Sequence, residues 1–188
     1  MTLTVGVLAL QGDFEAHAKI LSGLGAEARE VRVPDDLKGL DALVMPGGES
    51  TVMTLGIERE GLGEPLRRLA RSGMPVLGTC AGMIMLDRDH LDVLDILARR
   101  NAFGRQLRSF EADLDVTDVA GGPVHAVFIR APWVADMGDG VEVLADVDGH
   151  PVAVRQGNIV AVSFHPELTG ESRLHQLLLE LAAAQPGA

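Results

Sequence analysis

The sequence predicts an α/β fold built on a mostly parallel sheet, with an antiparallel extension in its second half. Over the first 80 residues, short apolar runs alternate with amphipathic stretches, which is typical of βαβ units and a parallel sheet. In the second half, strand-like runs are separated by two-residue turns at 148–149 and 157–158, which favour antiparallel pairing. No repeat or linker interrupts this pattern, so we expect one domain over residues 1–188.

The first half opens with a strand and a helix. Residues 3–12 are a β-branched apolar run that ends in glycine, which is typical of a buried strand. Residues 13–25 are amphipathic, and there Asp13 can cap a helix and Gly25 can end it. By the same criteria, we expect strands at residues 26–33, 40–48 and 74–80, and helices at 49–60 and 61–73.

The second half is expected to be mainly β-structure, followed by a terminal amphipathic helix at 171–184. In an open parallel sheet, catalytic and ligand-binding residues lie at the carboxyl ends of the strands. Loops at such ends are therefore candidate functional segments. The expected strands are 110–116, 122–132, 141–147, 150–156 and 158–164, and the candidate loops are 46–50, 79–83 and 164–168.

Composition argues against several classes of protein. A formal net charge of −11 repels a phosphate backbone, so nucleic acid is not an expected partner. No apolar run approaches the ~18 residues of a membrane span, and the N-terminus reads as a first strand without the basic region of a signal peptide. The single cysteine fits a reducing cytoplasm and excludes an internal disulfide or a cysteine-rich zinc site.

That single cysteine lies in a motif typical of a nucleophile. Cys80 follows an apolar run and has Gly78 and Gly82 two residues away on either side, the spacing of a strand-to-helix nucleophile elbow. At the start of the following helix, the dipole and the free N–H groups favour a thiolate. From these residues alone, the alternative is a buried structural cysteine.

A thiolate nucleophile needs a base, and the base needs an orienting group. His165 and Glu167 follow the last expected strand two residues apart, and in an extended segment such side chains point to the same side. We therefore expect the Glu167 carboxylate to hold the His165 imidazole. The remaining histidines lack a nearby carboxylate at a strand end and are expected to be surface or hydrogen-bonded residues; they are His17, His90, His125, His150 and His175.

Acyl transfer also needs donors for the developing oxyanion. The N–H of Ala81, directly after the expected nucleophile, is one candidate. Gly47 and Gly48 can direct further N–H groups into a pocket, and Ser50 can cap the helix that follows. The alternative is that the two glycines serve only a tight strand-to-helix turn.

Together these loops resemble the class I glutamine amidotransferases, which carry a Cys-His-Glu triad on a flavodoxin-like fold, a three-layer open sheet. Further stretches are similar to one family of that class, the glutaminase subunits of pyridoxal 5'-phosphate synthase. The resemblance covers nearly the whole chain, from Val5 to His175. It rests on VGVLALQGDFEAH, ALVMPGGEST, RRNAFGRQ, SFEADL, VFIRAPWV and AVRQGNIVAVSFHPELTG.

The resemblance implies a reaction and a set of site residues. Cys80 would attack the side-chain amide of L-glutamine, His165 would act as the base, and Glu167 would orient His165. The N–H groups of Gly48 and Ala81 would form the oxyanion hole. The glutamine site would comprise Gly48, Glu49, Ser50, Arg100, Ile129 and Arg130. A guanidinium suits the α-carboxylate of glutamine. From the residues alone, the alternative is that Arg100 and Arg130 form surface ion pairs.

The resemblance also implies a partner, a (β/α)8-barrel synthase subunit in a large hetero-oligomer that uses the ammonia. Pyridoxal 5'-phosphate would be the product of that complex, so neither a cofactor nor a metal is expected in this chain. The family usually carries a longer, glycine-rich segment between the cysteine and RRN. In this chain the corresponding segment is compact and reads AGMIMLDRDHLDVLDILA. The resemblance therefore does not predict how the chain runs into Arg100.

Two other functions compete with this interpretation. One is a different amidotransferase or cysteine hydrolase on the same fold, against which NAFGRQ and FIRAP argue. The other is a non-catalytic binding module, which would have no reason to keep Cys80, His165 and Glu167 together. A flavin-binding module would want a Ser/Thr-rich phosphate loop after the first strand, and LQGDFEAH is not one.

Overall fold

The structure is a computed structural model that describes residues 2–104 and 109–185. Within these residues, seven strands form one sheet in the order β2-β1-β3-β4-β11-β10-β9. The pairs from β2 to β11 are parallel, and β10 and β9 are added antiparallel. The parallel part has the flavodoxin-like strand order, so the predicted fold class is confirmed. The bounds are β1 (Thr4–Leu8), β2 (Glu27–Val31), β3 (Ala42–Met45), β4 (Val76–Thr79), β9 (Glu142–Val147), β10 (His150–Gln156) and β11 (Ile159–Val162).

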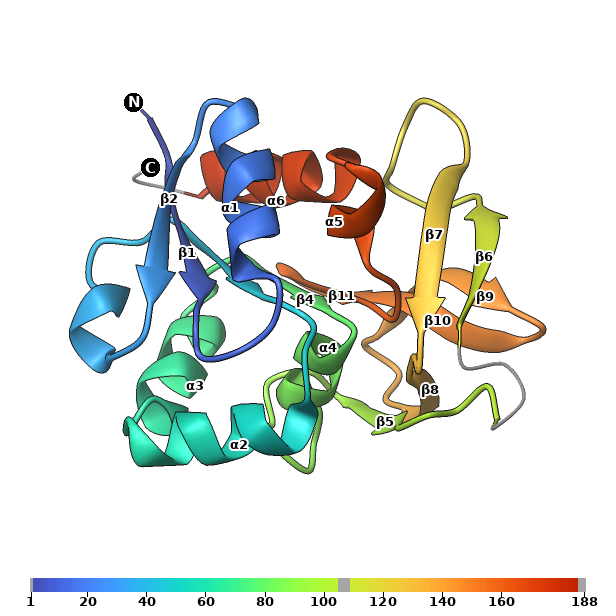
Figure 1. Cartoon of the computed structure of the whole chain (residues 1–188), viewed down its shortest axis with the longest axis horizontal. Coiled ribbons are helices and arrows are strands. Elements are labelled where there is room, and N and C mark those ends of the chain that lie inside the picture. The colour runs from blue at the N-terminus through green and yellow to red at the C-terminus, as the bar shows by residue number, and fades with distance from the viewer. Residues whose placement is uncertain (1, 105–108, 186–188) are drawn as a thin grey trace.

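Helices cover both faces of this sheet (Figure 1). One face carries α1 (Phe14–Gly23), α5 (Pro166–Thr169) and α6 (Arg173–Ala183). The other carries α2 (Ser50–Arg59), α3 (Gly63–Arg71) and α4 (Ala81–Leu86), and a short 3₁₀ helix, η1 (Pro34–Leu37), follows β2. No helix in this described part of the chain is long and apolar enough to cross a membrane.

The apolar cores on the two faces explain why the central strands are continuous apolar runs. In β3, Leu43 and Met45 belong to the core under α2–α4, while Ala42 and Val44 belong to the core under α1 and α6. Successive side chains of a strand point to opposite faces. A strand that is covered on both faces therefore has no polar side, and β3, β4 and β11 are buried throughout.

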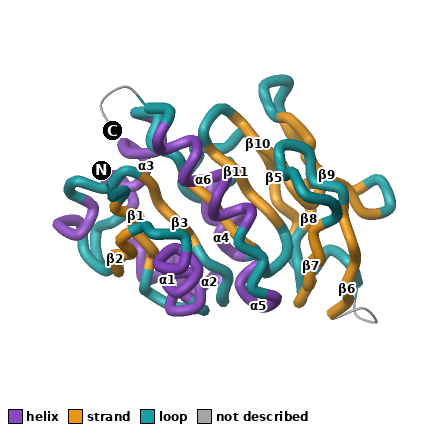
Figure 2. The backbone as a smooth tube through the Cα atoms, turned by 90° about the horizontal axis from the view of Figure 1, so that it is seen from above, coloured by secondary structure: helices purple, strands orange, loops and turns teal. Residues whose placement is uncertain are grey.

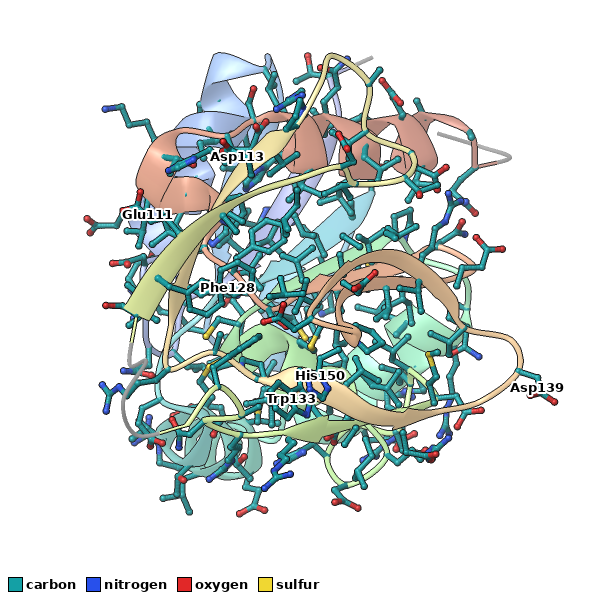
Figure 3. The ribbon with its side chains drawn as sticks, turned by 90° about the vertical axis from the view of Figure 1, so that its right-hand side faces the viewer. Glu111, Asp113, Phe128, Trp133, Asp139 and His150 are labelled. Carbon is teal, nitrogen blue, oxygen red and sulfur yellow. The ribbon has the colours of Figure 1, made fainter. Side chains whose placement is uncertain are left out.

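Two small antiparallel sheets lie at one end of the molecule, beside β9 and β10 (Figure 2). One pairs β6 (Ser109–Leu114) with β7 (Val124–Ile129), and the other pairs β5 (Ile96–Arg99) with β8 (Trp133–Met137). The predicted antiparallel extension is thus divided, because only β9 and β10 join the main sheet. The rings of Trp133 and His150 stack with centroids 3.6 Å apart and connect β8 to β10 (Figure 3).

Two expected helix caps are corrected by the structure. Asp13 precedes α1, but its side chain makes no capping hydrogen bond. Ser50 is the first residue of α2, and the cap is Glu49, whose carboxylate accepts hydrogen bonds from the N–H groups of Thr51 (3.3 Å) and Val52 (3.0 Å). Glu49 has the extended backbone that a cap requires.

The compact segment between α4 and β5 is held by a buried carboxylate. Asp87 accepts hydrogen bonds from the N–H groups of Asp89 (3.0 Å) and Ala98 (3.2 Å), and it lies 2.7 Å from Nδ1 of His90. Asp87 is 1% exposed, so these contacts satisfy a group that would be costly to bury alone. The segment that joins α4 to β5, on the way from Cys80 to Arg100, is therefore folded and has its own hydrogen bonds.

Candidate active site

One pocket of about 450 Å³ lies where the loops after β1, β3, β4 and β11 meet. Of the site residues expected from the sequence, all but Gly47 and Glu167 line this pocket, and Glu167 is buried behind His165. The lining comprises Gln11, Asp13, Gly48, Glu49, Ser50, Cys80, Ala81, Ile84, Arg100, Asn101, Ile129, Arg130, Pro132, His165 and Leu168. The Arg105–Gln106 end of the NAFGRQ motif lies outside the described residues.

Cys80 sits on a strained turn between β4 and α4. Its φ is +49°, in a region that residues other than glycine rarely adopt and that clusters at functional sites. The flanking glycines make the turn possible. A Cβ atom on Gly82 would lie 1.9 Å from the carbonyl oxygen of Met45, and one on Gly78 would lie 2.9 Å from the backbone of Gly82. The elbow predicted from the glycine spacing is therefore present.

His165 and Glu167 form a close pair at the end of β11. His165 Nδ1 lies 2.6 Å from Glu167 Oε1, and the Glu167 side chain is fully buried. The expected proximity is found, but the expected extended segment is not, since Pro166 begins α5. Proline fixes the backbone angle for a first helical turn, and that turn brings the carboxylate to the imidazole.

The surroundings of His165 favour its cationic form. Burial alone would lower the pKa of His165, but hydrogen bonding and charge attraction from Cys80 and Glu167 outweigh burial and raise the pKa from 6.5 to about 10. A protonated imidazole beside a thiol stabilises the thiolate. The electrostatics therefore suit a Cys–His nucleophile pair.

The loop after β3 passes directly against this pair. A Cβ atom on Gly47 would lie 2.6 Å from Cε1 of His165 and 3.2 Å from Cβ of Cys80. Gln11, in the loop after the neighbouring strand β1, accepts a hydrogen bond from the Glu49 N–H at 2.5 Å. Gln11 was not among the site residues expected from the sequence, where the only available signal was its place after the first strand.

Three residues on the other side of the pocket come from the β5–β6 and β7–β8 connections. Arg100 directs both terminal nitrogens toward Thr51 Oγ1 at 3.5 Å. Asn101 and Arg130 have φ of +46° and +43°, so strained backbone occurs here as well as at the elbow. The Ala102 N–H donates to the Ala131 carbonyl at 3.1 Å, which ties the two connections together.

A pair of buried histidines lies behind Glu167. His17 and His175 are both 0% exposed, and His17 Nε2 is 3.4 Å from Glu167 Oε2. Both are hydrogen-bonded, as expected, and His17 reaches a carboxylate from within helix α1 and not from a strand end. Across residues 2–104 and 109–185, no group of three or more His, Cys, Asp or Glu side chains is arranged to hold a metal ion.

A flavodoxin-like sheet with a cysteine elbow after one strand and a His–Glu pair after its neighbour is the arrangement of the class I glutamine amidotransferases. Within this class, the chain belongs to the SNO glutamine amidotransferase family, whose sequence pattern matches residues 7–183.

Individual relatives agree with this membership. The pyridoxal 5'-phosphate synthase subunit PdxT of Frankia alni is 54% identical over 186 residues, which cover 94% of each chain. The protein of that name from Mycobacteroides abscessus is 53% identical over 193 residues, covering 98% of this chain and 100% of that protein. A crystal structure of a glutamine amidotransferase matches 96% of this chain and 99% of its own with a TM-score of 0.89 and 49% identity. The structure of PurLQS from Thermotoga maritima shares the fold, with a TM-score of 0.70 at 20% identity over 96% of this chain and 99% of the matched chain.

Proposed function

We propose that this chain is one glutaminase domain, residues 1–188, that hydrolyses L-glutamine to L-glutamate and ammonia for pyridoxal 5'-phosphate (vitamin B6) biosynthesis. One observation carries the proposal. Cys80 and His165 meet at one pocket, and His165 is hydrogen-bonded to the buried Glu167, in a chain of the SNO glutamine amidotransferase family.

The first half of the reaction is acylation of the cysteine. The Cys80 sulfur attacks the side-chain amide carbon of glutamine, and His165 takes the thiol proton. Collapse of the tetrahedral intermediate breaks the C–N bond, and His165 returns the proton to the departing nitrogen as ammonia leaves. Glu167 holds Nδ1 of His165, so that Nε2 remains free for both transfers.

The second half is hydrolysis of the glutamyl thioester. His165 removes a proton from water, the resulting hydroxide attacks the thioester carbon, and the C–S bond breaks to release L-glutamate. The N–H groups of Gly48 and Ala81 serve as the oxyanion hole in both halves. Both residues line the pocket beside Cys80, which supports this role.

Glutamine is held by the residues around the thiol. Gly48, Glu49 and Ser50 border one side of the pocket, and Arg100, Ile129 and Arg130 border the other. A guanidinium group binds a carboxylate through two parallel hydrogen bonds, so we assign the α-carboxylate to the arginines. Pyridoxal 5'-phosphate is a product of the complex in this scheme and not a cofactor of the chain.

The ammonia is used by a partner, a (β/α)8-barrel synthase subunit in a large hetero-oligomer of the cytoplasm. The relatives are named as synthase subunits, which supports this assignment. Two exposed apolar side chains line the pocket, Ile129 (39% exposed) and Leu168 (48% exposed), and Val52 in the first turn of α2 is also 48% exposed. Such side chains suit the core of a protein interface, and docking there would shield the reaction from water.

The test is ammonia release from L-glutamine by the purified chain, alone and with a pyridoxal 5'-phosphate synthase barrel subunit. We expect release that rises sharply with the barrel subunit and is absent in Cys80→Ala. A synthase that takes ammonia from another amidotransferase serves as the control and should give no rise. No ammonia in either condition would reject the proposed function.

A further inference from the structure

The fully buried histidines His17 and His175 lie outside the Cys-His-Glu triad. His17 is on α1 and His175 is on α6, and His17 Nδ1 lies 2.8 Å from His175 Nε2. Burying a polar ring costs free energy that an aliphatic side chain would not. The pair therefore calls for a role beyond filling the core between the two helices.

The other ring nitrogen of His17, Nε2, lies close to both Glu167 and the residue that precedes Cys80. His17 Nε2 is 3.4 Å from Oε2 of Glu167 and 3.4 Å from Oγ1 of Thr79, the residue before Cys80. Glu167 Oε1 is taken by His165, while Oε2 is buried and has no hydrogen-bond partner in the described part of the chain. A shift of a few tenths of an ångström would bring His17 Nε2 within hydrogen-bond distance of Oε2.

The roles of the ring nitrogens depend on the tautomer, and the groups that face His17 indicate which nitrogen donates. Burial, with the charges of His175 and His165, lowers the pKa of His17 to about 3, so the neutral ring has one N–H. A carboxylate only accepts hydrogen bonds, which favours the proton on Nε2, facing Glu167. His17 Nδ1 then accepts from Nε2–H of His175, whose pKa burial lowers to about 4.

We propose that His17 is a positioning residue for the triad, in which its Nε2–H holds Oε2 of Glu167 so that Oε1 stays aligned with His165. His175 fixes the tautomer of His17. A continuous series of side-chain contacts then runs from the pocket to helix α6, through Cys80, His165, Glu167, His17 and His175. The inference rests on the proposed function, because it assigns His17 to the machinery of that reaction.

Two polar substitutions separate positioning from packing. Glutamine places its amide NH₂ near the position of Nε2, whereas asparagine stops near Nδ1 and leaves Glu167 without a donor. With the barrel subunit present, we expect His17→Gln to keep kcat within about threefold of wild type. We expect His17→Asn to lose about ten- to a hundredfold in kcat with KM unchanged, as for a lost hydrogen bond to a charged group.

The single cysteine provides a readout that does not depend on turnover. Alkylation by iodoacetamide, followed by intact mass, reports the reactivity of Cys80 alone because the chain has no other cysteine. We expect slower alkylation at pH 7 in His17→Asn than in His17→Gln or wild type. The matched control is Leu21→Ala, another fully buried position on α1, which should lower the melting temperature and leave the alkylation rate unchanged.

Each outcome decides whether His17 positions Glu167 or only packs the core. If His17→Asn does not fold, His175→Leu replaces it, and the loss of the tautomer partner should lower kcat at least about threefold. Equal kcat and equal alkylation in wild type and His17→Asn, or in wild type and His175→Leu, would show that the pair only packs the core. Absence of turnover in the wild type with its barrel subunit would instead reject the proposed function itself.

Discussion

His165 Nδ1 lies 2.6 Å from Oε1 of Glu167 across the first turn of helix α5. The contact occupies Nδ1 and leaves the other ring nitrogen available for a hydrogen bond with Cys80. It also places a fully buried carboxylate next to the imidazole, where its charge is poorly screened. The arrangement therefore supports the raised pKa of His165.

The charge of Glu167 is predicted to matter more than its shape. Glu167→Gln keeps the size of the side chain but removes the negative charge that orients and stabilises the imidazolium. We expect kcat for glutamine hydrolysis to fall by at least about 100-fold with little change in KM. Steady-state kinetics with the barrel subunit measure this, and Glu171→Gln, outside the pocket, is the control. Wild-type kcat in Glu167→Gln would remove Glu167 from the mechanism.

The loop glycine next to His165 is predicted to tolerate no side chain. The added methyl group of Gly47→Ala would lie 2.6 Å from His165 Cε1 and push the imidazole away from the thiol. A displacement of about 1 Å is enough to lower kcat by roughly 100-fold. Gly23→Ala is the matched control, because a Cβ atom there meets nothing within 4 Å. Unchanged kcat in Gly47→Ala would mean that the loop moves aside before reaction.

Arg130 is predicted to act in binding. Arg130→Ala removes a guanidinium from the pocket wall, and loss of a charge-assisted hydrogen bond should raise KM by about ten- to a hundredfold. The melting temperature should change little, because Arg130 is exposed. Arg99→Ala, next to Arg100 but outside the pocket, should leave KM unchanged. A lost cooperative melt with an unchanged KM in the folded fraction would assign Arg130 to stability instead.

The buried histidine pair predicts a loss of stability in acid. Their pKa values are lowered from 6.5 to about 3 for His17 and about 4 for His175, so both are neutral in either state well above pH 6.5. Below that pH, the unfolded chain takes up protons that the folded chain excludes. The free energy of unfolding should then fall by up to about 1.4 kcal/mol per pH unit for each histidine.

Urea unfolding between pH 7 and pH 5 measures this slope. Asp36 and Glu171, whose pKa values are lowered by hydrogen bonds from the backbone of Arg32 and the side chain of Arg173 respectively, destabilise the fold only as the pH falls below their ordinary pKa values of 3.8 and 4.5, which lie below this range. The comparison with His175→Leu isolates the histidine contribution, and we expect a shallower slope in that variant. Identical slopes would show that His175 is protonated alike in the folded and unfolded chains.

Local features were predictable from the sequence. The elbow at Cys80 depends on Gly78 and Gly82, which are close in sequence and needed for close packing of α4 on β3 and β4. The parallel strands were predictable because burial on both faces makes them apolar runs. The proximity of His165 and Glu167 was also expected, although through an extended segment and not through the first turn of α5.

Features that depend on long-range packing were not predictable. The contact of His17 with Glu167 joins α1 to α5, and nothing near His17 in the sequence indicates it. Gln11 enters the pocket only because the strand order places β1 beside β3. The edge strands β5 and β8 were missed because only part of each is buried, and β8 has three exposed residues.

The most direct test of the central claim is the intact mass of the chain during turnover. The chain is mixed with L-glutamine and the barrel subunit, and the reaction is quenched in acid within the first turnovers. The intact mass of the chain is then measured by mass spectrometry. We predict a glutamyl adduct on wild type, located at Cys80 by peptide mapping, and neither adduct nor ammonia from Cys80→Ala. Ammonia release from Cys80→Ala at the wild-type rate, with no adduct on either chain, would contradict nucleophilic catalysis by Cys80.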